Sequence, residues 1–306
     1  MLHSWQIWST CVSVISGNLI RPTSSRKKFC LIAERLCWKR EHVFAYADPF
    51  LLSAEGRLWL FVEQQTRSGK GCIAAFSTID LLKWERHGVV LRESTHLSYP
   101  QVFREGGMFW MVPESAQSGA VWLYQAKTLP GPWVRSKKLL EGVYVDPTLI
   151  CHETRWYIWL TDSLGALRFY HSDQLQGPFK EHVSSPITTD NRYARCGGRP
   201  VRLPDGSLIR LAQDGSGHYG NKLHGMRIEV LTSSLYQETL MISDVLPRDA
   251  EWNAMGGHHM DCTVYNEETV QCVDGWNVDR NLNSIPRAFW RLIDSIKRVK
   301  TSLSLK

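Results

Sequence analysis

The feature that most constrains this chain is a repeat of about fifty residues. Five segments share one pattern: a polar turn, a run of alternating aromatic or aliphatic residues, and an acidic residue at the end. These acidic residues stand 51, 48, 52 and 60 residues apart, at Glu63, Glu114, Asp162, Asp214 and Asp274. A unit of this length is too long for a pair of helices and matches a four-stranded propeller blade.

A short strand precedes each of these segments and opens with a polar residue, usually followed by proline. Proline is tolerated at the first residue of a strand because no ladder hydrogen bond is needed there. The openings are Asp48-Pro49, Tyr99-Pro100, Asp146-Pro147, Arg199-Pro200 and, without proline, His258-His259. With the strands that follow, the pattern predicts an all-β, five-bladed β-propeller over residues 1–279. A β-sandwich of similar strand count is the alternative, but it predicts no fifty-residue register.

The fifth unit runs out of strand after Asp274-Gly275-Trp276, so its outer strands must come from elsewhere in the chain. Residues 5–14 have the composition of a strand and precede the first blade. We expect this N-terminal segment to pair with the last blade and close the ring, which removes an open sheet edge.

The C-terminal tail, residues 280–306, carries the excess of positive charge. Its seven Lys and Arg residues against Asp294 account for the whole formal net charge of +6. A basic groove over the body is therefore not indicated, and we expect no nucleic-acid partner. Apolar residues recur in the tail at three- and four-residue steps, which predicts an amphipathic helix. We expect it to pack on the body; contact with a membrane surface or a partner is the alternative.

No segment has the length and apolar character of a transmembrane helix, and residues 5–20 lack the basic start of a signal peptide. We therefore expect a cytoplasmic location and reduced thiols at all eight cysteines. No CxxC pair occurs, and His258, His259 and Asp261 fit no strong metal signature. The sequence predicts no metal and no cofactor, and it leaves the oligomeric state open.

The innermost strands of a propeller line its axis, so their first residues converge at one end of the central channel. This places Asp48, Tyr99, Asp146, Arg199 and His259 around one funnel, although Asp-Pro and Tyr-Pro pairs also commonly initiate turns. Residues of similar character accompany them at Glu63, His96, Glu114, Arg195, Gln213, Asp214, Tyr219, His258 and Asp274. Five polar openings in one register favour a shared ligand site.

A sugar, glycan or nucleotide-sugar ligand suits this set of residues, because two carboxylates across a pocket are the minimum apparatus for glycoside hydrolysis. No GxSxG elbow, P-loop, HExxH or dinucleotide fingerprint occurs in the chain. The sequence therefore favours a carbohydrate-active protein.

Several short motifs in fixed order strengthen this hypothesis. They include Ala47-Asp48-Pro49-Phe50, Pro113-Glu114-Ser115, Val145-Asp146-Pro147, Ala212-Gln213-Asp214 and Tyr219-Gly220. Over about residues 40–276 the chain resembles the N-terminal propeller domain of plant glucosamine inositolphosphorylceramide transferases and related bacterial proteins. That domain is similar in turn to the five-bladed family 43 glycoside hydrolases.

The resemblance implies that Asp48 is a general base and that Asp146 orients the substrate and tunes the acid. It also exposes a departure, because family 43 hydrolases carry their acidic glutamate where this chain has Arg199. Arginine cannot donate a proton at neutral pH, which leaves Glu114 or Glu63 as the candidate acid. Arg195 and Arg199 suit an anionic sugar. Two hypotheses remain open: an enzyme of glycoside hydrolysis or glycosyl transfer, and a non-catalytic glycan-recognition or accessory module.

Overall fold

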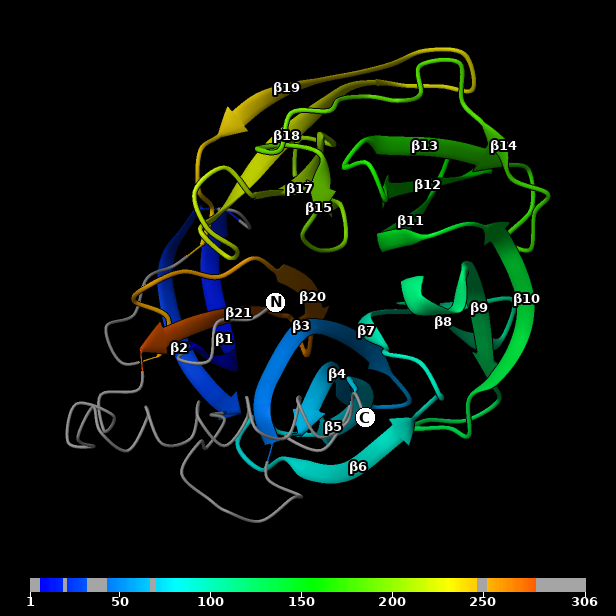
Figure 1. Cartoon of the computed structure of the whole chain (residues 1–306). Coiled ribbons are helices and arrows are strands. Elements are labelled where there is room, and N and C mark those ends of the chain that lie inside the picture. Colours follow the sequence, from blue (N-terminus) through cyan, green and yellow to red (C-terminus); the bar gives the residue numbers. More distant parts are fainter. Residues whose placement is uncertain (1–5, 19–20, 32–42, 67–69, 247–251, 279–306) are drawn as a thin grey trace, which may run out of the picture.

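A computed structural model of the chain describes residues 6–18, 21–31, 43–66, 70–246 and 252–278. This part of the protein is all-β, and its sheets are arranged around a central axis (Figure 1). The one helical element among these residues is a 3-10 turn at Ala116–Ser118. The C-terminal helix expected from residue 280 onward lies outside the described residues.

Consecutive strands form antiparallel meanders that follow the fifty-residue repeat. The first contains β3 (Val43–Ala54), β4 (Arg57–Thr66), β5 (Cys72–Thr78) and β6 (Glu85–Leu91). The second contains β7 (Ser98–Glu105), β8 (Met108–Glu114), β9 (Ala120–Ala126) and β10 (Val134–Glu141). The third contains β11 (Tyr144–His152), β12 (Arg155–Asp162), β13 (Leu167–Ser172) and β14 (Lys180–Glu181).

The fourth unit has a divided inner edge, and the last unit takes strands from both ends of the chain. In the fourth, β15 (Arg195–Cys196) and β16 (Val201–Arg202) both pair with β17 (Leu208–Asp214), followed by β18 (Lys222–Leu231) and β19 (Tyr236–Ile242). In the last, β20 (Met260–Tyr265) pairs with β21 (Glu268–Val278), β21 with β1 (Gln6–Asn18), and β1 with β2 (Arg21–Leu31). The N-terminal segment thus pairs with the strand that the sequence predicts for it.

Two cysteines correct the sequence-based expectation of reduced thiols. Cys11 of β1 and Cys30 of β2 are register partners and form a disulfide. Hairpin pairing brings the two thiols together, and nothing in their spacing of 19 residues indicates it. The cysteines at 72, 151, 196, 262 and 272 are free. The cytoplasmic location, which rested on the lack of an export signal, stays a prediction.

Three of the strand openings adopt an unusual backbone conformation. Asp48, Tyr99 and Asp146 have φ angles of +50°, +47° and +49°, a left-handed region that non-glycine residues rarely occupy. The ladder register shifts at each of these positions. A bulge of this kind takes a residue out of the ladder and redirects its side chain. At these three openings the bulge therefore also sets the direction of the side chain.

Side chains complete the hydrogen bonding of the inner strands. Gln101 on β7 bridges to the neighbouring β11: its amide donates to the Leu149 carbonyl and accepts from the Leu149 N–H, both at 2.7 Å. Asp261 on β20 accepts from the N–H of Leu51 on β3 at 2.8 Å. These contacts tie neighbouring inner strands together and satisfy backbone groups that the ladders leave free.

Arg199 is the most connected side chain of this axial network. Its guanidinium donates to the carbonyls of Leu51, at 3.2 Å, and Val102, at 2.9 Å, and to Asp261 at 3.1 Å. One side chain from the fourth unit therefore joins the inner strands of the first, second and last.

The apolar core lies within and between the sheets. One large cluster runs from Phe50 and Phe61 in the first unit to Tyr236 in the fourth. Ring contacts cross from one unit to the next: Phe61 meets Trp133 edge-on with 5.9 Å between ring centroids, and Trp159 meets Tyr236 at 5.8 Å. Tryptophan and tyrosine along the strands thus fill the gaps between sheets.

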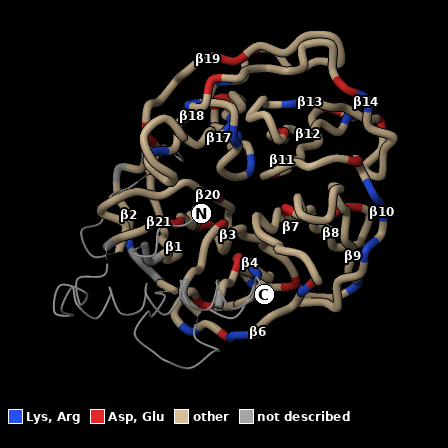
Figure 2. Tube along the Cα trace, in the orientation of Figure 1, with Lys and Arg blue, Asp and Glu red and all other residues tan. Residues whose placement is uncertain are grey.

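Charged residues of both signs alternate around the outer strands, and acidic segments lie near the centre beside β3, β4 and β7 (Figure 2). Among the described residues, no helix has the length and apolar character needed to cross a membrane.

Replacing Arg199 tests the axial network. Arg199→Ala would leave the Asp261 carboxylate buried without its partner, so we expect the free energy of unfolding in urea to fall by about 3–5 kcal/mol. Arg202→Ala, which removes an exposed arginine three residues away, serves as the control and should cost under about 1 kcal/mol. Similar losses in the two variants would contradict the role given to Arg199.

Candidate functional site

A cavity of about 300 Å³ lies where several strand ends meet. Strands β3, β4, β7, β8, β15 and β1 contribute to it, together with the loops that carry His96, Tyr219 and His258. Its lining is Trp8, Ala45, Ala47, Asp48, Glu63, Gln65, His96, Ser98, Glu114, Arg195, Tyr219 and His258. Residues from distant parts of the sequence thus form one polar pocket.

The Glu114 carboxyl is part of a chain of four side chains. It hydrogen-bonds to Asp146, which accepts from Arg195 Nε and, at 2.9 Å, from Gln213 Nε2. Burial would raise the pKa of Asp146, but Arg195 and these hydrogen bonds hold that pKa below its usual value. Burial and the neighbouring Asp146 charge raise the pKa of Glu114 well above its usual value. These opposite shifts favour the protonated form of Glu114 and the ionised form of Asp146.

Asp48 faces the same pocket from the bulge in β3. Its Oδ2 accepts from the Tyr99 N–H at 3.2 Å, and its own N–H donates to Asp274 Oδ2 at 3.1 Å. Burial raises the pKa of Asp48 well above its usual value; His258 opposes the shift, and the charges of Glu63 and Asp146 add to it. A carboxyl with a raised pKa is suited to exchange a proton near neutral pH.

The Glu63 carboxylate, which also lines the pocket, is held by two donors, His96 and Gln65. Gly71 N–H donates to His96 Nδ1 at 2.9 Å, so the His96 proton resides on Nε2, which lies 3.2 Å from Glu63 Oε1. Gln65 also donates to Oε1. Glycine is required at 71 because a Cβ there would lie 2.5 Å from the Glu63 carboxylate.

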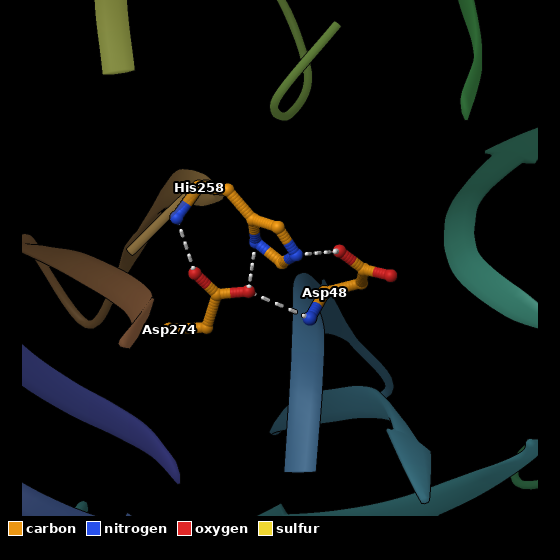
Figure 3. A group of neighbouring side chains, drawn as sticks. All are labelled: Asp48, His258 and Asp274. Carbon is orange, nitrogen blue, oxygen red and sulfur yellow. Dashed lines mark hydrogen bonds and ion pairs between the residues drawn. The ribbon is translucent and has the colours of Figure 1, made fainter. Parts of the chain in front are cut away.

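Asp274 does not line the pocket, but it fixes the position of His258, which does (Figure 3). Its Oδ1 accepts from the N–H groups of His258 and His259, both at 2.9 Å, and its Oδ2 lies 2.6 Å from His258 Nδ1. Burial would lower the pKa of His258, but Asp274 and then Asp48 raise it. The other ring nitrogen, Nε2, lies 3.9 Å from Asp48 Oδ1.

Asp48, His258 and Asp274 also offer three ligand atoms within 4.8 Å of one another. Both Asp274 oxygens are already engaged, by three backbone N–H groups and the His258 ring. This donor set fits a hydrogen-bond network better than a metal cage. The absence of a metal stays a prediction.

The lining also includes aromatic and polar residues that the sequence analysis predicted only in part. Tyr219 was predicted, whereas Trp8, Gln65 and Ser98 were missed. Trp8 lies on the N-terminal strand, and its ring centroid is 5.6 Å from that of Tyr219. Only the pairing of β1 beside β3 places Trp8 here, and the repeat pattern carries no signal for that contact.

Seven predicted site residues do not line the pocket. Arg199 lies in the axial network and borders a separate cavity of about 170 Å³, so the expectation that it grips a ligand in this pocket was wrong. Asp214 faces His224 instead, with 3.3 Å between its Oδ2 and His224 Nε2. The other five are buried outside the lining: Asp146, Gln213, Asp274, Tyr99 and His259.

Tyr99 and His259 show why a strand opening need not face a ligand. The Tyr99 hydroxyl lies 2.7 Å from Thr148 Oγ1 and accepts from the Gly198 N–H at 2.8 Å, so the phenol joins β7, β11 and the segment between β15 and β16. The His259 ring packs edge-on against Phe50 and Tyr99. Burial lowers the pKa of His259 to about 3, and this histidine is neutral.

Solved structures share this fold. An alpha-L-arabinofuranosidase of family 43 from Clostridium thermocellum superposes with a TM-score of 0.56 at 16% identity, covering 74% of this chain and 80% of that one. The alpha-L-arabinofuranosidase PaAbf62A from Podospora anserina gives 0.58 at 12% identity, covering 88% and 98%. The fold is that of the propeller glycoside hydrolases.

The family follows from sequence comparison. Residues 37–276 match the family model described as glucosamine inositolphosphorylceramide transferase 1, N-terminal, and the chain belongs to this family. Glucosamine inositolphosphorylceramide transferase 1 of Arabidopsis thaliana is 35% identical over 244 residues, which cover 75% of this chain and 32% of that protein. The Oryza sativa subsp. japonica protein is 34% identical over 229 residues, covering 70% and 31%. The chain thus matches about a third of the length of these relatives.

Acid titration tests the Asp274 network. Burial would raise the pKa of Asp274, but His258 and the backbone donors lower it. A lowered pKa stabilises the fold above the unfolded-state pKa of about 3.9, and this stabilisation is lost as the pH falls through the folded-state value. At pH 7 we expect Asp274→Asn to lower the free energy of unfolding by about 3 kcal/mol.

The difference between wild type and Asp274→Asn should shrink below about pH 4, measured by urea unfolding at several pH values. Asp173→Asn, at a carboxylate that is 80% exposed, is the matched control and should follow the wild type. A difference that persists unchanged at pH 3 would contradict the ionised state assigned to Asp274.

Proposed function

We propose that the pocket binds a sugar and acts on a glycosidic bond, by hydrolysis or glycosyl transfer. In this proposal Glu114 is the general acid, Asp48 the general base, and Asp146 the carboxylate that tunes the acid. We also infer that the propeller has five blades, with β20, β21, β1 and β2 forming the blade that closes the ring.

The observation that carries the proposal is the position of Glu114, which lines the cavity and is hydrogen-bonded to the buried Asp146. An acid catalyst must hold its proton at neutral pH and yet face the leaving group. Glu114 lines the cavity, and its hydrogen bond to the ionised Asp146 favours the protonated form. In this proposal Glu114 does the work of the acidic glutamate that family 43 hydrolases carry where this chain has Arg199.

Asp48 supports the second role because it faces the same cavity as Glu114. Two carboxyl groups that flank a single pocket permit acid–base chemistry on a bond between them. The proximity of His258 favours the ionised form of Asp48, as a base requires. Glycosidic cleavage needs one carboxyl that gives a proton and one that accepts it.

The charge of the pocket bears on the class of sugar. The prediction of an anionic sugar rested on two arginines; Arg199 lies elsewhere, and Arg195 is already paired with Asp146. Because Asp146 balances Arg195 and Glu114 is neutral in this proposal, Asp48 and Glu63 are the acidic groups of the lining. An amino sugar suits this pocket better, because its ammonium group is attracted to Glu63. The curated relatives are named for glucosamine.

A non-catalytic glycan-recognition or accessory module is the second candidate. It is favoured by the replacement at position 199, where the side chain ties inner strands together rather than serving chemistry. In that case the pocket would bind a sugar without turning it over.

Activity measurements distinguish the two candidates. We expect wild type to release nitrophenol from 4-nitrophenyl glucosaminides or to consume a nucleotide sugar such as UDP-N-acetylglucosamine. Glu114→Gln and Asp48→Asn should each lower kcat/KM by about 10²–10⁴-fold. Glu141→Gln, at an exposed glutamate outside the pocket, is the matched control and should match the wild type.

The pH profile assigns the two roles. Loss of the alkaline limb of kcat/KM in Glu114→Gln identifies the acid, and loss of the acidic limb in Asp48→Asn identifies the base. Equal turnover in wild type and both variants would remove these residues from the mechanism. Sugar binding by wild type without any turnover would favour the recognition module.

A further inference from the structure

The pocket contains an aromatic pair that the proposed acid–base chemistry does not use. Trp8 comes from β1, and Tyr219 comes from the loop between β17 and β18; both line the cavity. Trp8 is 1% exposed and lies 4.4 Å from the His258 ring, whereas Tyr219 is 40% exposed. A buried ring therefore backs a half-exposed one at the edge of the pocket.

The Tyr219 ring is held in place from several sides. Its edge meets the His258 ring at 4.8 Å with an interplanar angle of 86°, and the Arg195 guanidinium lies 5.4 Å from its centroid. The next residue, Gly220, has a φ angle of +71°, and its carbonyl accepts from Trp276 Nε1 at 3.0 Å. A Cβ at Gly220 would lie 2.4 Å from the Trp8 ring. The loop is thus clamped against β1 and β21.

The Trp8 indole contributes a polar group as well. Its Nε1–H is buried and has no hydrogen-bond partner among the described residues. A buried indole N–H usually finds an acceptor. Other tryptophans also lack a partner, but Trp8 is the one of them that borders the cavity.

The lining combines two kinds of chemistry. The carboxyls of Asp48, Glu63 and Glu114 come from β3, β4 and β8, and the rings come from β1 and the β17–β18 loop. A sugar ring also combines two kinds of surface, because its hydroxyls lie around the edge and its C–H bonds form apolar faces. A lining of this kind matches a ligand whose hydroxyls contact carboxyls and whose apolar face contacts an aromatic ring.

We propose that Trp8 and Tyr219 form a specificity subsite for the apolar face of a sugar ring. Tyr219 stacks on the C–H face, and Trp8 Nε1–H donates to an oxygen of the same sugar. This inference rests on the proposed function, since it concerns the ligand of the same pocket. The N-terminal strand, which precedes the family match at residues 37–276, then sets which sugar is accepted in addition to completing a sheet.

Saturation-transfer NMR with glucosamine and N-acetylglucosamine tests this subsite on the full chain. Irradiation of the protein's aromatic protons should transfer saturation to the C–H protons of one face of the sugar, in wild type and in Tyr219→Phe. Tyr219→Ala should lose this pattern, and its Kd should rise about 2–10-fold. Trp8→Phe should keep the pattern and raise Kd about 3–10-fold, because a hydrogen bond is lost.

Trp84→Phe is the matched control, because Trp84 also has an unpartnered Nε1 but packs on Phe29 outside the pocket. Its Kd should equal that of wild type. If wild type binds and Tyr219→Ala binds equally well, the subsite is overturned while the proposed function stands. If wild type binds neither sugar, both are overturned. Tyr219 is half-exposed, so the Tyr219 variants decide the outcome even where Trp8→Phe fails to fold.

Discussion

The structure depends on how the inner strands satisfy the backbone groups that face the central axis. A strand at the edge of a sheet presents N–H and C=O groups that no ladder pairs, and burying them unpaired is costly. Here side chains bridge from one unit to the next: Gln101 pairs with Leu149, Asp261 accepts from Leu51, and Arg199 reaches the carbonyls of two neighbouring units. The same contacts fix the distances between strand openings, and hence the shape of the pocket.

The electrostatics of the pocket follow from this rigid frame. Asp146 is held ionised because Arg195 and Gln213 donate to it, and the charge so fixed keeps the proton on the neighbouring Glu114. On the other side, Asp274 collects three backbone N–H groups and orients His258 toward Asp48. Asp48 and Glu114, which both face the cavity, thus each have a charged neighbour that influences their pKa. Burial makes these partners effective, because few waters compete with them.

The sequence predicted much of this arrangement, because a repeat constrains topology strongly. The fifty-residue period located the strands and the residues at their openings, and the missing outer strands indicated the pairing of β1 with β21. The direction in which a side chain leaves an opening could not be predicted. Asp48 lines the pocket, whereas Arg199 donates to the carbonyls of Leu51 and Val102 on neighbouring inner strands. Gln213 and Asp214 are adjacent on one strand and point to opposite faces, so only one of them supports Asp146. Trp8 and the Cys11–Cys30 disulfide depend on contacts of the N-terminal hairpin, which lies outside the repeat.

The central claim is that Glu114 carries a proton at neutral pH because Asp146 is fixed as a carboxylate. Carbon-13 NMR of the glutamate side-chain carboxyls, with Glu114 assigned by comparison with Glu114→Gln, measures this directly. The account predicts a Glu114 carboxyl that still has the chemical shift of the protonated form at pH 7. A Glu114 signal that titrates near the ordinary glutamate pKa of about 4.3 would contradict it.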